Sequence, residues 1–506
     1  MKHLYLLIFL CLPLSSSFAL ELKRGPYLQS GSDVQVTFAW RTDVNSNGLV
    51  KYGTDPNDLN QQKLSNSNVK DHFVTVTGLN PNTKYYYSIG SSTEVLASGP
   101  DYFVWTAPAK GVAKKTRMWV LGDSGTATAD ARDVRDAYYA FTGNTHTDLW
   151  MMLGDNAYPN GTDTQFQNAV FDTYPEMLRK SVLWPAIGNH SLLDAGETAY
   201  LDIFDLPTNA EAGGLASGTE NYYSFDYGNI HLVVLDSLVS SRSATGAMAM
   251  WFEEDLAATD QDWIIVYWHH PPYTKGSHDS DSGNMKQMRE VFNPILENAG
   301  VDLVLGGHSH GYERSFLLQG HYGLSNTFNS NTMIVQPGNG REGEDGAYTK
   351  PSLGVNPQQG VVYTVAGSSG KVNVNEPYDH PAMFISLPSL GSVVIDIDGG
   401  RLDMQFINEN AQVLDSFSMI KGSGQASEVL NQNMPEGTDN ENMDATSENN
   451  DSLTHTDTSV GNGLGCNAGA LKNTSLPYIL LIWSLASFIM RQRRIRLHHL
   501  GKSTTV

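Results

Sequence analysis

Two histidines one residue apart lie in the run Gly307-His308-Ser309-His310. An apolar run, residues 301–305, leads into them, which is typical of a buried strand that ends at a sheet edge. The glycines allow the backbone to turn tightly at this point. On an extended loop the two imidazoles can aim at two separate points, which suits a pair of metal ions better than one. A solvated loop would show the same pattern, so the other strand ends must decide.

Four more apolar runs end at side chains that can bind a metal. They are Val120-Leu121-Gly122-Asp123, Met152-Leu153-Gly154-Asp155-Asn156-Ala157-Tyr158, Pro185-Ala186-Ile187-Gly188-Asn189-His190 and Val266-Tyr267-Trp268-His269. In α/β architectures, ligands from the carboxyl ends of several strands converge at one edge of the sheet. Five apolar runs that each end at a possible metal ligand are unlikely to occur by chance in one chain. They predict that these side chains form one shared site.

The composition limits which partners this site can serve. The chain has 506 residues, 40% of them apolar, and a formal net charge of −22. Such an acidic chain excludes a nucleic-acid partner, because phosphate backbones need a basic surface. An anionic substrate therefore requires a local positive charge, which bound metal ions would supply. The two cysteines, Cys11 and Cys466, lie near the ends, so no disulfide is expected in the folded middle.

The middle of the chain divides into two expected domains. Residues 22–107 contain short β-rich runs separated by turns, which favours an all-β antiparallel sandwich acting as a spacer or packing domain. Residues 115–420 alternate strands with helices, which favours an α/β two-sheet sandwich flanked by helices. We expect strands at 118–121, 149–153, 231–235, 263–268 and 361–367, helices at 130–141, 248–257 and 285–298, and a hairpin around residues 398–400.

The two ends of the chain carry export signals. Residues 1–19 read as a signal peptide cleaved after Ala19, since the apolar run is too short for a membrane span. Residues 422–465 are an Asn/Ser-rich acidic linker, expected to be disordered. Residues 476–490 are apolar and are followed by arginines, which predicts a C-terminal membrane segment. Two roles remain open for it: a tail cut by a sorting protease, or a plain anchor. The protein is expected to be secreted or at the cell surface.

The motif series resembles a known family. Gly-Asp-x-Gly, Gly-Asp-x-x-Tyr, Gly-Asn-His, Val-x-x-His and Gly-His-x-His, in this order, resemble the purple acid phosphatase branch of the calcineurin-like metallophosphoesterases. The segment 24–29, Arg-Gly-Pro-Tyr-Leu-Gln, resembles the same branch. The run Gly-Leu-x-Pro-x-Thr-x-Tyr-x-Tyr at 78–87 is similar to a corner of fibronectin type III modules.

The resemblance implies a binuclear metal centre. In the broader superfamily the first motif is usually Asp-x-His; Gly125 stands in place of that histidine here, and Tyr158 can replace it. A phenolate is a hard donor that suits Fe(III) and would colour the protein. The first metal is then Fe(III), and the second is a divalent ion (Zn, Mn or Fe). The implied ligands are Asp123, Tyr158 and His310 for the first metal, Asn189, His269 and His308 for the second, and Asp155 for both.

The resemblance also implies an acid phosphatase that hydrolyses phosphate monoesters of small molecules. Two ions roughly 3.5 Å apart would hold a hydroxide in line with phosphorus. Next to ligand Asn189, His190 is the candidate for orienting phosphate or protonating the leaving oxygen. His278 matches a substrate-contacting position, with a solvated loop histidine as its alternative. A phosphodiesterase or nucleotidase on the same metals is the alternative function, and a non-enzymatic adhesion scaffold is a third.

Overall fold

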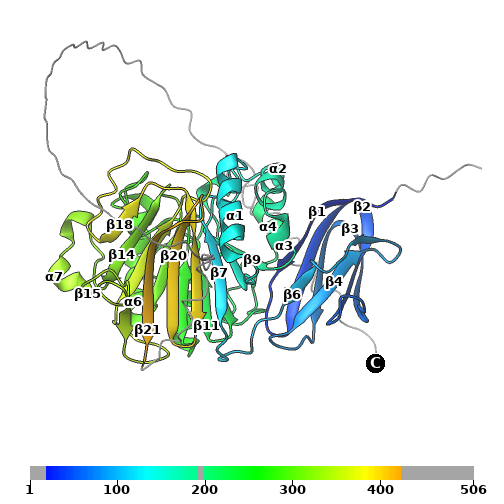
Figure 1. Cartoon of the computed structure of the whole chain (residues 1–506), viewed down its shortest axis with the longest axis horizontal. Helices are drawn as coiled ribbons and strands as arrows, with labels where there is room; N and C mark the ends of the chain where they lie inside the picture. Colours follow the sequence, from blue (N-terminus) through cyan, green and yellow to red (C-terminus); the bar gives the residue numbers. More distant parts are fainter. Residues whose placement is uncertain (1–18, 192–197, 423–506) are drawn as a thin grey trace, which may run out of the picture. The chain divides into compact units, whose positions relative to one another are not determined.

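The computed structural model describes residues 19–191 and 198–422 (Figure 1). Within these residues, a unit made only of strands comes first, drawn in blue, and a unit of two sheets with helices follows. This confirms the predicted fold class, an all-β sandwich followed by a two-sheet α/β domain.

The first unit is built from antiparallel strands. Their bounds are β1 (Leu22–Gln29), β2 (Gln35–Gly53), β3 (Gln61–Thr77), β4 (Lys84–Gly90), β5 (Val95–Ala97) and β6 (Phe103–Trp105). Cross-strand pairs such as Val36 and Val76 in β2 and β3 are buried, as the alternating sequence requires. At the turn before β4, the Asn80 amide donates to the Tyr85 hydroxyl at 3.1 Å. A tyrosine hydroxyl bonded to upstream backbone is the corner known from sandwich domains.

The first sheet of the second unit has a parallel centre. It consists of β7 (Thr116–Leu121), β8 (Leu149–Met152) and β9 (Val182–Pro185), extended by antiparallel β19 (Gly391–Asp398), β20 (Arg401–Asn408) and β21 (Val413–Lys421), with β16 (Tyr348–Lys350) at the edge. The central strands are apolar on both faces, as expected where both faces are covered. Helix α1 (Ala129–Thr142) covers one face, where Trp119 stacks on Tyr138 with ring centroids 4.2 Å apart.

The second sheet lies against the other face. Its strands are β10 (Tyr223–Tyr227), β11 (Ile230–Val234), β12 (Trp263–Tyr267), β13 (Leu303–Gly306), β17 (Val361–Ala366), β14 (Tyr312–Leu318) and β15 (Ile334–Gln336) in spatial order, with β18 (Met383–Leu387) paired to β14. Along β11, Leu232 and Val234 belong to the core shared with the first sheet. Val233 between them belongs to a second core under α5 (Ala247–Ala258) and α6 (Gly283–Ala299). The period-2 alternation therefore separates two cores.

The predicted elements agree closely with the structure. The long helices are α1, α5 and α6, each within two residues of its predicted bounds, and the predicted strands correspond to β7, β8, β11, β12 and β17. The predicted hairpin joins β19 to β20. The short helices were not predicted: α2 (Asp163–Phe166), α3 (Pro175–Leu178), α4 (Thr198–Ile203) and α7 (Ser330–Met333). Segments of one turn are too short to show a helical period.

A strand pairing joins the two units, which the sequence did not predict. Strand β1 runs parallel to β9, with Leu28 opposite Val182. Next to this pair, the Gln29 side chain donates from Nε2 to the Leu183 carbonyl at 3.0 Å. The strands of the first unit thus continue the order of the first sheet. Of the two roles expected for this unit, these contacts favour packing over a spacer.

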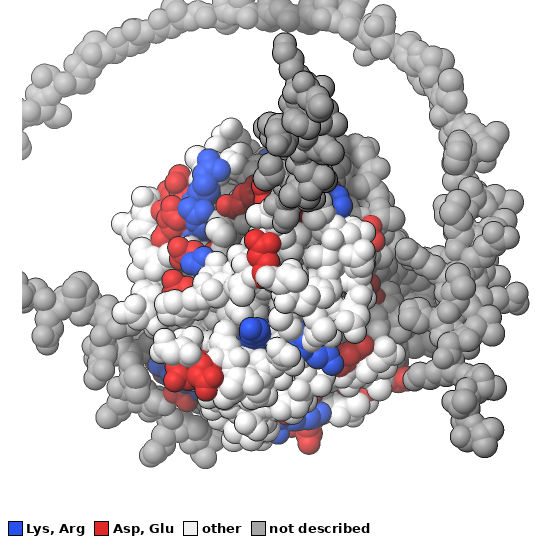
Figure 2. Space-filling model, turned by 90° about the vertical axis from the view of Figure 1, so that its right-hand side faces the viewer, with Lys and Arg blue, Asp and Glu red and all other residues white. Residues whose placement is uncertain are grey.

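Figure 2 shows the surface of the face on the right-hand side of Figure 1. On the described part of this face, Lys and Arg residues (blue) alternate with Asp and Glu residues (red) within a larger area of other residues (white). A nucleic-acid backbone needs one continuous basic surface, and this face does not present one.

The predicted terminal segments lie outside the described residues. These are the signal peptide 1–19, except Ala19, the linker 422–465, except Gly422, and the apolar segment 476–490. Their roles stay predictions. Within the described ranges, no helix combines the length and the apolar character that crossing a membrane requires.

Candidate metal centre

The predicted ligands come together where two sheets end. Asp123 follows β7, Asp155 and Tyr158 follow β8, Asn189 follows β9, His269 follows β12, and His308 and His310 follow β13. Strands β7, β8 and β9 are parallel to one another, and so are β12 and β13. The ends of the two sheets approach closely: a Cβ on Gly122 would lie 3.3 Å from Gly307 Cα. All seven predicted ligands form one cluster connected by the contacts below.

Three of these residues have an unusual backbone conformation. The φ angles of Asp123, Asp155 and His308 are +57°, +52° and +67°. Non-glycine residues rarely adopt this left-handed region, and such strain is concentrated at functional sites. Each residue directly follows a glycine that lies one or two residues past the end of a strand.

The carboxylate of Asp155 faces two groups of donors, one with each oxygen. Oδ2 accepts from the Tyr158 hydroxyl at 3.0 Å. Oδ1 lies 3.3 Å from His269 Nε2 and accepts from the His190 amide at 2.7 Å. The side chain is buried, so these groups replace solvent around it. A carboxylate in this position can bridge two cations.

The first group surrounds Asp123. Its Oδ1 accepts from the Tyr158 hydroxyl at 3.0 Å and lies 3.6 Å from His310 Nε2. Its Oδ2 accepts from the His308 amide at 2.6 Å. A side chain at Gly125 would overlap the backbone between Asp155 and Ala157. No histidine fits there, and the Tyr158 oxygen lies between the two carboxylates.

The second group surrounds His269, which is fully buried. Its Nε2 lies 3.0 Å from Asn189 Oδ1 and 3.2 Å from His308 Nδ1. Its Nδ1 lies 2.9 Å from the Leu153 carbonyl, which fixes the ring. Ligand atoms of Asp155, His269 and His308 all lie within 4.8 Å of one another. This group offers two imidazole nitrogens, an amide oxygen and one carboxylate oxygen.

The two predicted catalytic histidines border the cluster. His190 Nδ1 lies 2.7 Å from the Pro159 carbonyl, and its ring packs on Tyr158 with centroids 4.5 Å apart. His278 stacks on His308 at 3.8 Å between centroids and lies edge-on to His310 at 5.9 Å. The structure therefore brings both to the site, and His278 is half-buried rather than a solvated loop residue.

The electrostatics of the cluster call for cations. Burial and the nearby Asp155 charge raise the pKa of Asp123 to about 7, against the lowering effect of His269. Burial and the charges of Asp123 and Asp155 raise the pKa of Tyr158. Burial and neighbouring imidazoles lower the pKa of His308, which keeps its ring neutral, the form that binds metals. Buried oxygen donors with too little positive charge around them fit a metal centre.

A sixth strand end contributes a residue that the sequence analysis missed. After β17, the Asn373 side-chain oxygen lies 3.0 Å from His310 Nδ1. The backbone amide of Asn373 donates to the His310 carbonyl at 2.9 Å. Partners of this kind orient metal-binding histidines. The sequence marked the apolar run 361–367 as a strand, but Asn373 lies six residues beyond its end, so this run did not point to Asn373.

Another buried carboxylate ties the His278 loop to the metal-binding loop. The Thr274 hydroxyl lies 2.8 Å from the hydroxyl of Ser309, which stands between His308 and His310. The same Thr274 hydroxyl bonds to the Glu313 carboxylate. Burial raises the pKa of Glu313 to about 7. Two hydroxyls and one carboxyl group thus link the loop of His278 to the loop of His308 and His310.

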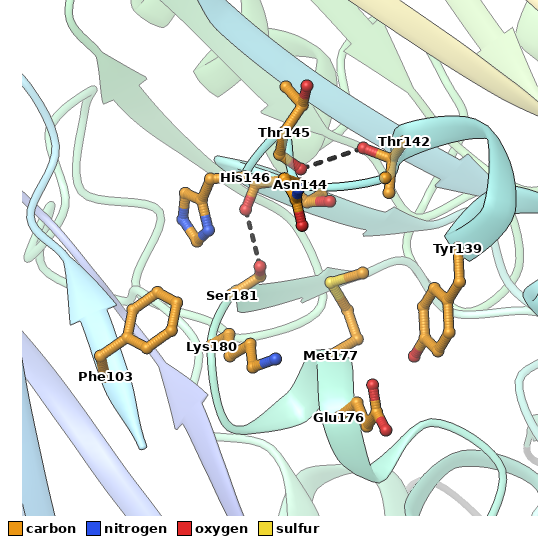
Figure 3. A pocket seen from close by; sticks show the side chains of 12 residues that line it. Phe103, Tyr139, Thr142, Asn144, Thr145, His146, Glu176, Met177, Lys180 and Ser181 are labelled. Carbon is orange, nitrogen blue, oxygen red and sulfur yellow. Dashed lines mark hydrogen bonds between the residues drawn. The ribbon is translucent and has the colours of Figure 1, made fainter. Parts of the chain in front are cut away.

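A separate cavity of about 380 Å³ lies away from this cluster (Figure 3). Its lining includes Phe103, Tyr139, His146, Met177 and Ser181, and none of the predicted site residues. Ser181 directly precedes β9, so the cavity lies at the opposite end of that strand from Asn189. The hydroxyls drawn bonded in Figure 3 use backbone carbonyls as partners, as Ser181 does at 2.6 Å.

Two family models match the chain. Residues 24–110 match the purple acid phosphatase N-terminal domain, and residues 116–312 match the calcineurin-like phosphoesterase domain. The second match spans the strand ends from β7 to β13 and contains all seven predicted ligands.

Similar proteins are known from plants. Purple acid phosphatase 15 of Arabidopsis thaliana is 28% identical over 273 residues, 48% of this chain and 49% of that protein. Purple acid phosphatase 23 of Arabidopsis thaliana is 29% identical over 269 residues, 48% of this chain and 57% of that protein. The chain thus spans about half the length of these relatives.

A solved structure shares the fold. It is the purple acid phosphatase PPD1 isolated from yellow lupin (Lupinus luteus) seeds, with a TM-score of 0.61, 18% identity, and coverage of 79% of this chain and 75% of that one. The chain thus combines a segment that matches the purple acid phosphatase N-terminal domain with one that matches the calcineurin-like phosphoesterase domain, and it shares its fold with the lupin protein.

Proposed function

We propose that the protein is a binuclear-metal phosphatase that hydrolyses phosphate monoesters of small molecules. The observation that carries this proposal is the two-sided contact of Asp155, with Oδ2 toward Tyr158 and Oδ1 toward His269. Asp123, Tyr158 and His310 would hold one ion, Asn189, His269 and His308 the other, and Asp155 both. The complete donor set argues against a non-enzymatic scaffold.

The chemistry of the donors supports different ions in the two positions. The first group offers two carboxylates and a phenol oxygen, hard donors that suit Fe(III). The second group is richer in imidazole nitrogen, which suits Zn, Mn or Fe as a divalent ion. When bound, such a pair supplies Lewis-acid stabilisation of the phosphoryl oxygens and an activated water. Bound cations also supply the positive charge that a phosphate needs in a chain of net charge −22.

The remaining residues act on the substrate directly. The Pro159 carbonyl holds His190 Nδ1, so Nε2 is left to contact a phosphoryl oxygen or to protonate the leaving oxygen. His278, stacked on His308, forms part of the same wall and can contact the phosphate or its ester oxygen. Because burial and the neighbouring His269 lower the pKa of His278, this ring acts as a neutral hydrogen-bonding group in the metal-free chain.

The test combines elemental analysis, a visible spectrum and two assays on the purified full chain. We expect two metal equivalents, at least one of them iron, a visible absorption band, and faster hydrolysis of an aryl phosphate monoester than of its diester. Faster diester hydrolysis would favour the phosphodiesterase or nucleotidase alternative. A protein that holds both metals yet turns over neither ester would refute the proposed function.

We further propose that the chain is exported and held at the surface. The support is the sequence of residues 1–19 and 476–490. Amino-terminal sequencing of the mature protein should begin after Ala19, and membrane fractions should release the protein if a sorting protease cuts the tail. An uncut amino terminus starting at Met1 would contradict export through this signal.

A further inference from the structure

The loop that follows β17 lies against both metal-binding loops. Its Ser369 amide donates to the Gly122 carbonyl at 3.0 Å, and its Gly367 amide donates to the Gly311 carbonyl at 3.1 Å. A Cβ on Gly370 would lie 3.0 Å from the Asp123 carbonyl oxygen. After position 371, the backbone amide of Asn373 donates to the His310 carbonyl at 2.9 Å. Residues on both sides of position 371 are therefore hydrogen-bonded to the backbone of the candidate metal centre.

This loop places the ammonium group of Lys371 beside the cluster. Lys371 Nζ lies 5.7 Å from the centre of the Tyr158 ring. Two residues further along the same loop, the Asn373 side-chain oxygen lies 3.0 Å from His310 Nδ1. The ammonium group thus stands beside the candidate ligand Tyr158, on a loop that also contacts the candidate ligand His310.

The charge of Lys371 is not neutralised by the protein. Its side chain is exposed, and within residues 19–191 and 198–422 its ammonium is recorded over the Tyr158 ring and in no ion pair. Many surface lysines are unpaired and simply solvated. Lys371 differs from them because the loop on both sides of it is hydrogen-bonded to the candidate metal centre and its ammonium group lies over the ring of Tyr158.

We propose that Lys371 selects substrates that carry a second anionic group, a carboxylate or another phosphate, next to the phosphate ester. This inference rests on the proposed function, and it names the substrate class of the same site. The metal ions would hold the transferred phosphate, so an ammonium group at the rim of the cluster is free to pair with a neighbouring anion. Lys371 is then a specificity-determining residue.

The test compares two substrates that differ in one group: 2-phosphoglycolate, which carries a carboxylate, and ethyl phosphate, which does not. In Lys371→Met, we expect kcat/KM for 2-phosphoglycolate to fall about fivefold, mainly through KM, which corresponds to the loss of one partly exposed ion pair. For ethyl phosphate we expect a change below about twofold. Lys371→Arg should retain most of the preference, because it retains the charge.

Lys286→Met is the matched control, because Lys286 is a partly exposed helical lysine that pairs with Glu290 at 3.6 Å. It should leave both substrates unaffected. Equal losses on both substrates, a changed visible spectrum or a loss of metal in Lys371→Met would overturn the inference, since Lys371 would then act on the metal centre. No loss on either substrate would overturn it as well. If the metal-loaded wild type hydrolyses neither ester, the proposed function itself has failed.

Discussion

The side-chain oxygen of Asn373 lies 3.0 Å from Nδ1 of His310. When this oxygen accepts the Nδ1 proton, Nε2 keeps its lone pair on the side of Asp123. Asn373→Ala should therefore weaken metal binding about 10- to 100-fold, the usual effect of removing a partner of a metal-binding histidine. Competition with a chelator measures this affinity.

The conservative variant Asn373→Asp tests whether Asn373 acts through hydrogen bonding. Aspartate keeps an acceptor for the Nδ1 proton, so metal affinity should return most of the way to wild type. If Asn373→Asp binds metal as weakly as Asn373→Ala, the hydrogen bond to His310 does not orient the ligand.

Removing the shared carboxylate should empty the centre. Asp155→Ala takes away oxygens that face both donor groups, so the purified variant should lose both metal equivalents together with activity. Elemental analysis per chain is the measurement. The exposed Asp260→Ala serves as control and should keep two metals. Full turnover in Asp155→Ala would disprove the bridging role.

The phenol of Tyr158 should give the protein its colour. Tyr158→Phe removes the oxygen 3.0 Å from both Asp123 and Asp155, so the visible band should disappear while the fold is retained. Tyr139→Phe is the control, because the buried Tyr139 hydroxyl has no hydrogen-bond partner among the described residues. A band that persists in Tyr158→Phe would place the chromophore elsewhere.

A buried histidine at the amino-terminal end of β11, His231, should make stability depend on pH. His231 lies between Asp226, 2.8 Å from Nδ1, and Asp255, 2.9 Å from Nε2. Burial lowers the pKa of His231, but its two carboxylate partners outweigh burial and raise it to about 9. The stabilisation is therefore complete below about pH 6.5 and is lost as the pH rises through about 9, on the order of 3 kcal/mol in all.

Urea unfolding between pH 6 and 10 measures this effect. His231→Gln should be less stable than wild type at low pH and should show a smaller decrease of the unfolding free energy with rising pH. His380→Gln is the matched control: burial lowers the pKa of His380 to about 3. Between about pH 8 and 10 this ring is neutral in both the folded and the unfolded chain, so its removal should leave the slope in that range unchanged. Equal slopes in wild type and His231→Gln would contradict the assignment.

Much of the fold could be predicted because the apolar residues follow recognisable patterns along the longer helices and the strands. Helices α1 and α6 have an apolar face with a helical period, short apolar runs mark the central strands of the second unit, and the motifs after these runs name the side chains at the sheet edge. Within each sheet, parallel strands place the residues of these motifs at the same edge, Asp123 beside Asp155 and His269 beside His308. Local patterns were sufficient for residues that directly follow a strand.

The rest depends on contacts between segments distant in sequence. Asn373 acts on His310 from 63 residues away, and no local pattern pairs an asparagine with a particular histidine. The pairing of Leu28 with Val182 joins two units that we predicted from the sequence as separate domains. The short α2 and α3 likewise depend on tertiary packing rather than on their own propensity.

The parallel pairing of β1 with β9 limits how this protein can be truncated. The second unit expressed without residues 19–110 would present β9 as an open edge, with backbone amides and carbonyls that β1 otherwise occupies. Such an edge recruits strands from other copies, so the shortened chain would self-associate. The first unit thus covers the edge strand β9 of the second unit. The two units should therefore be expressed together, as one chain.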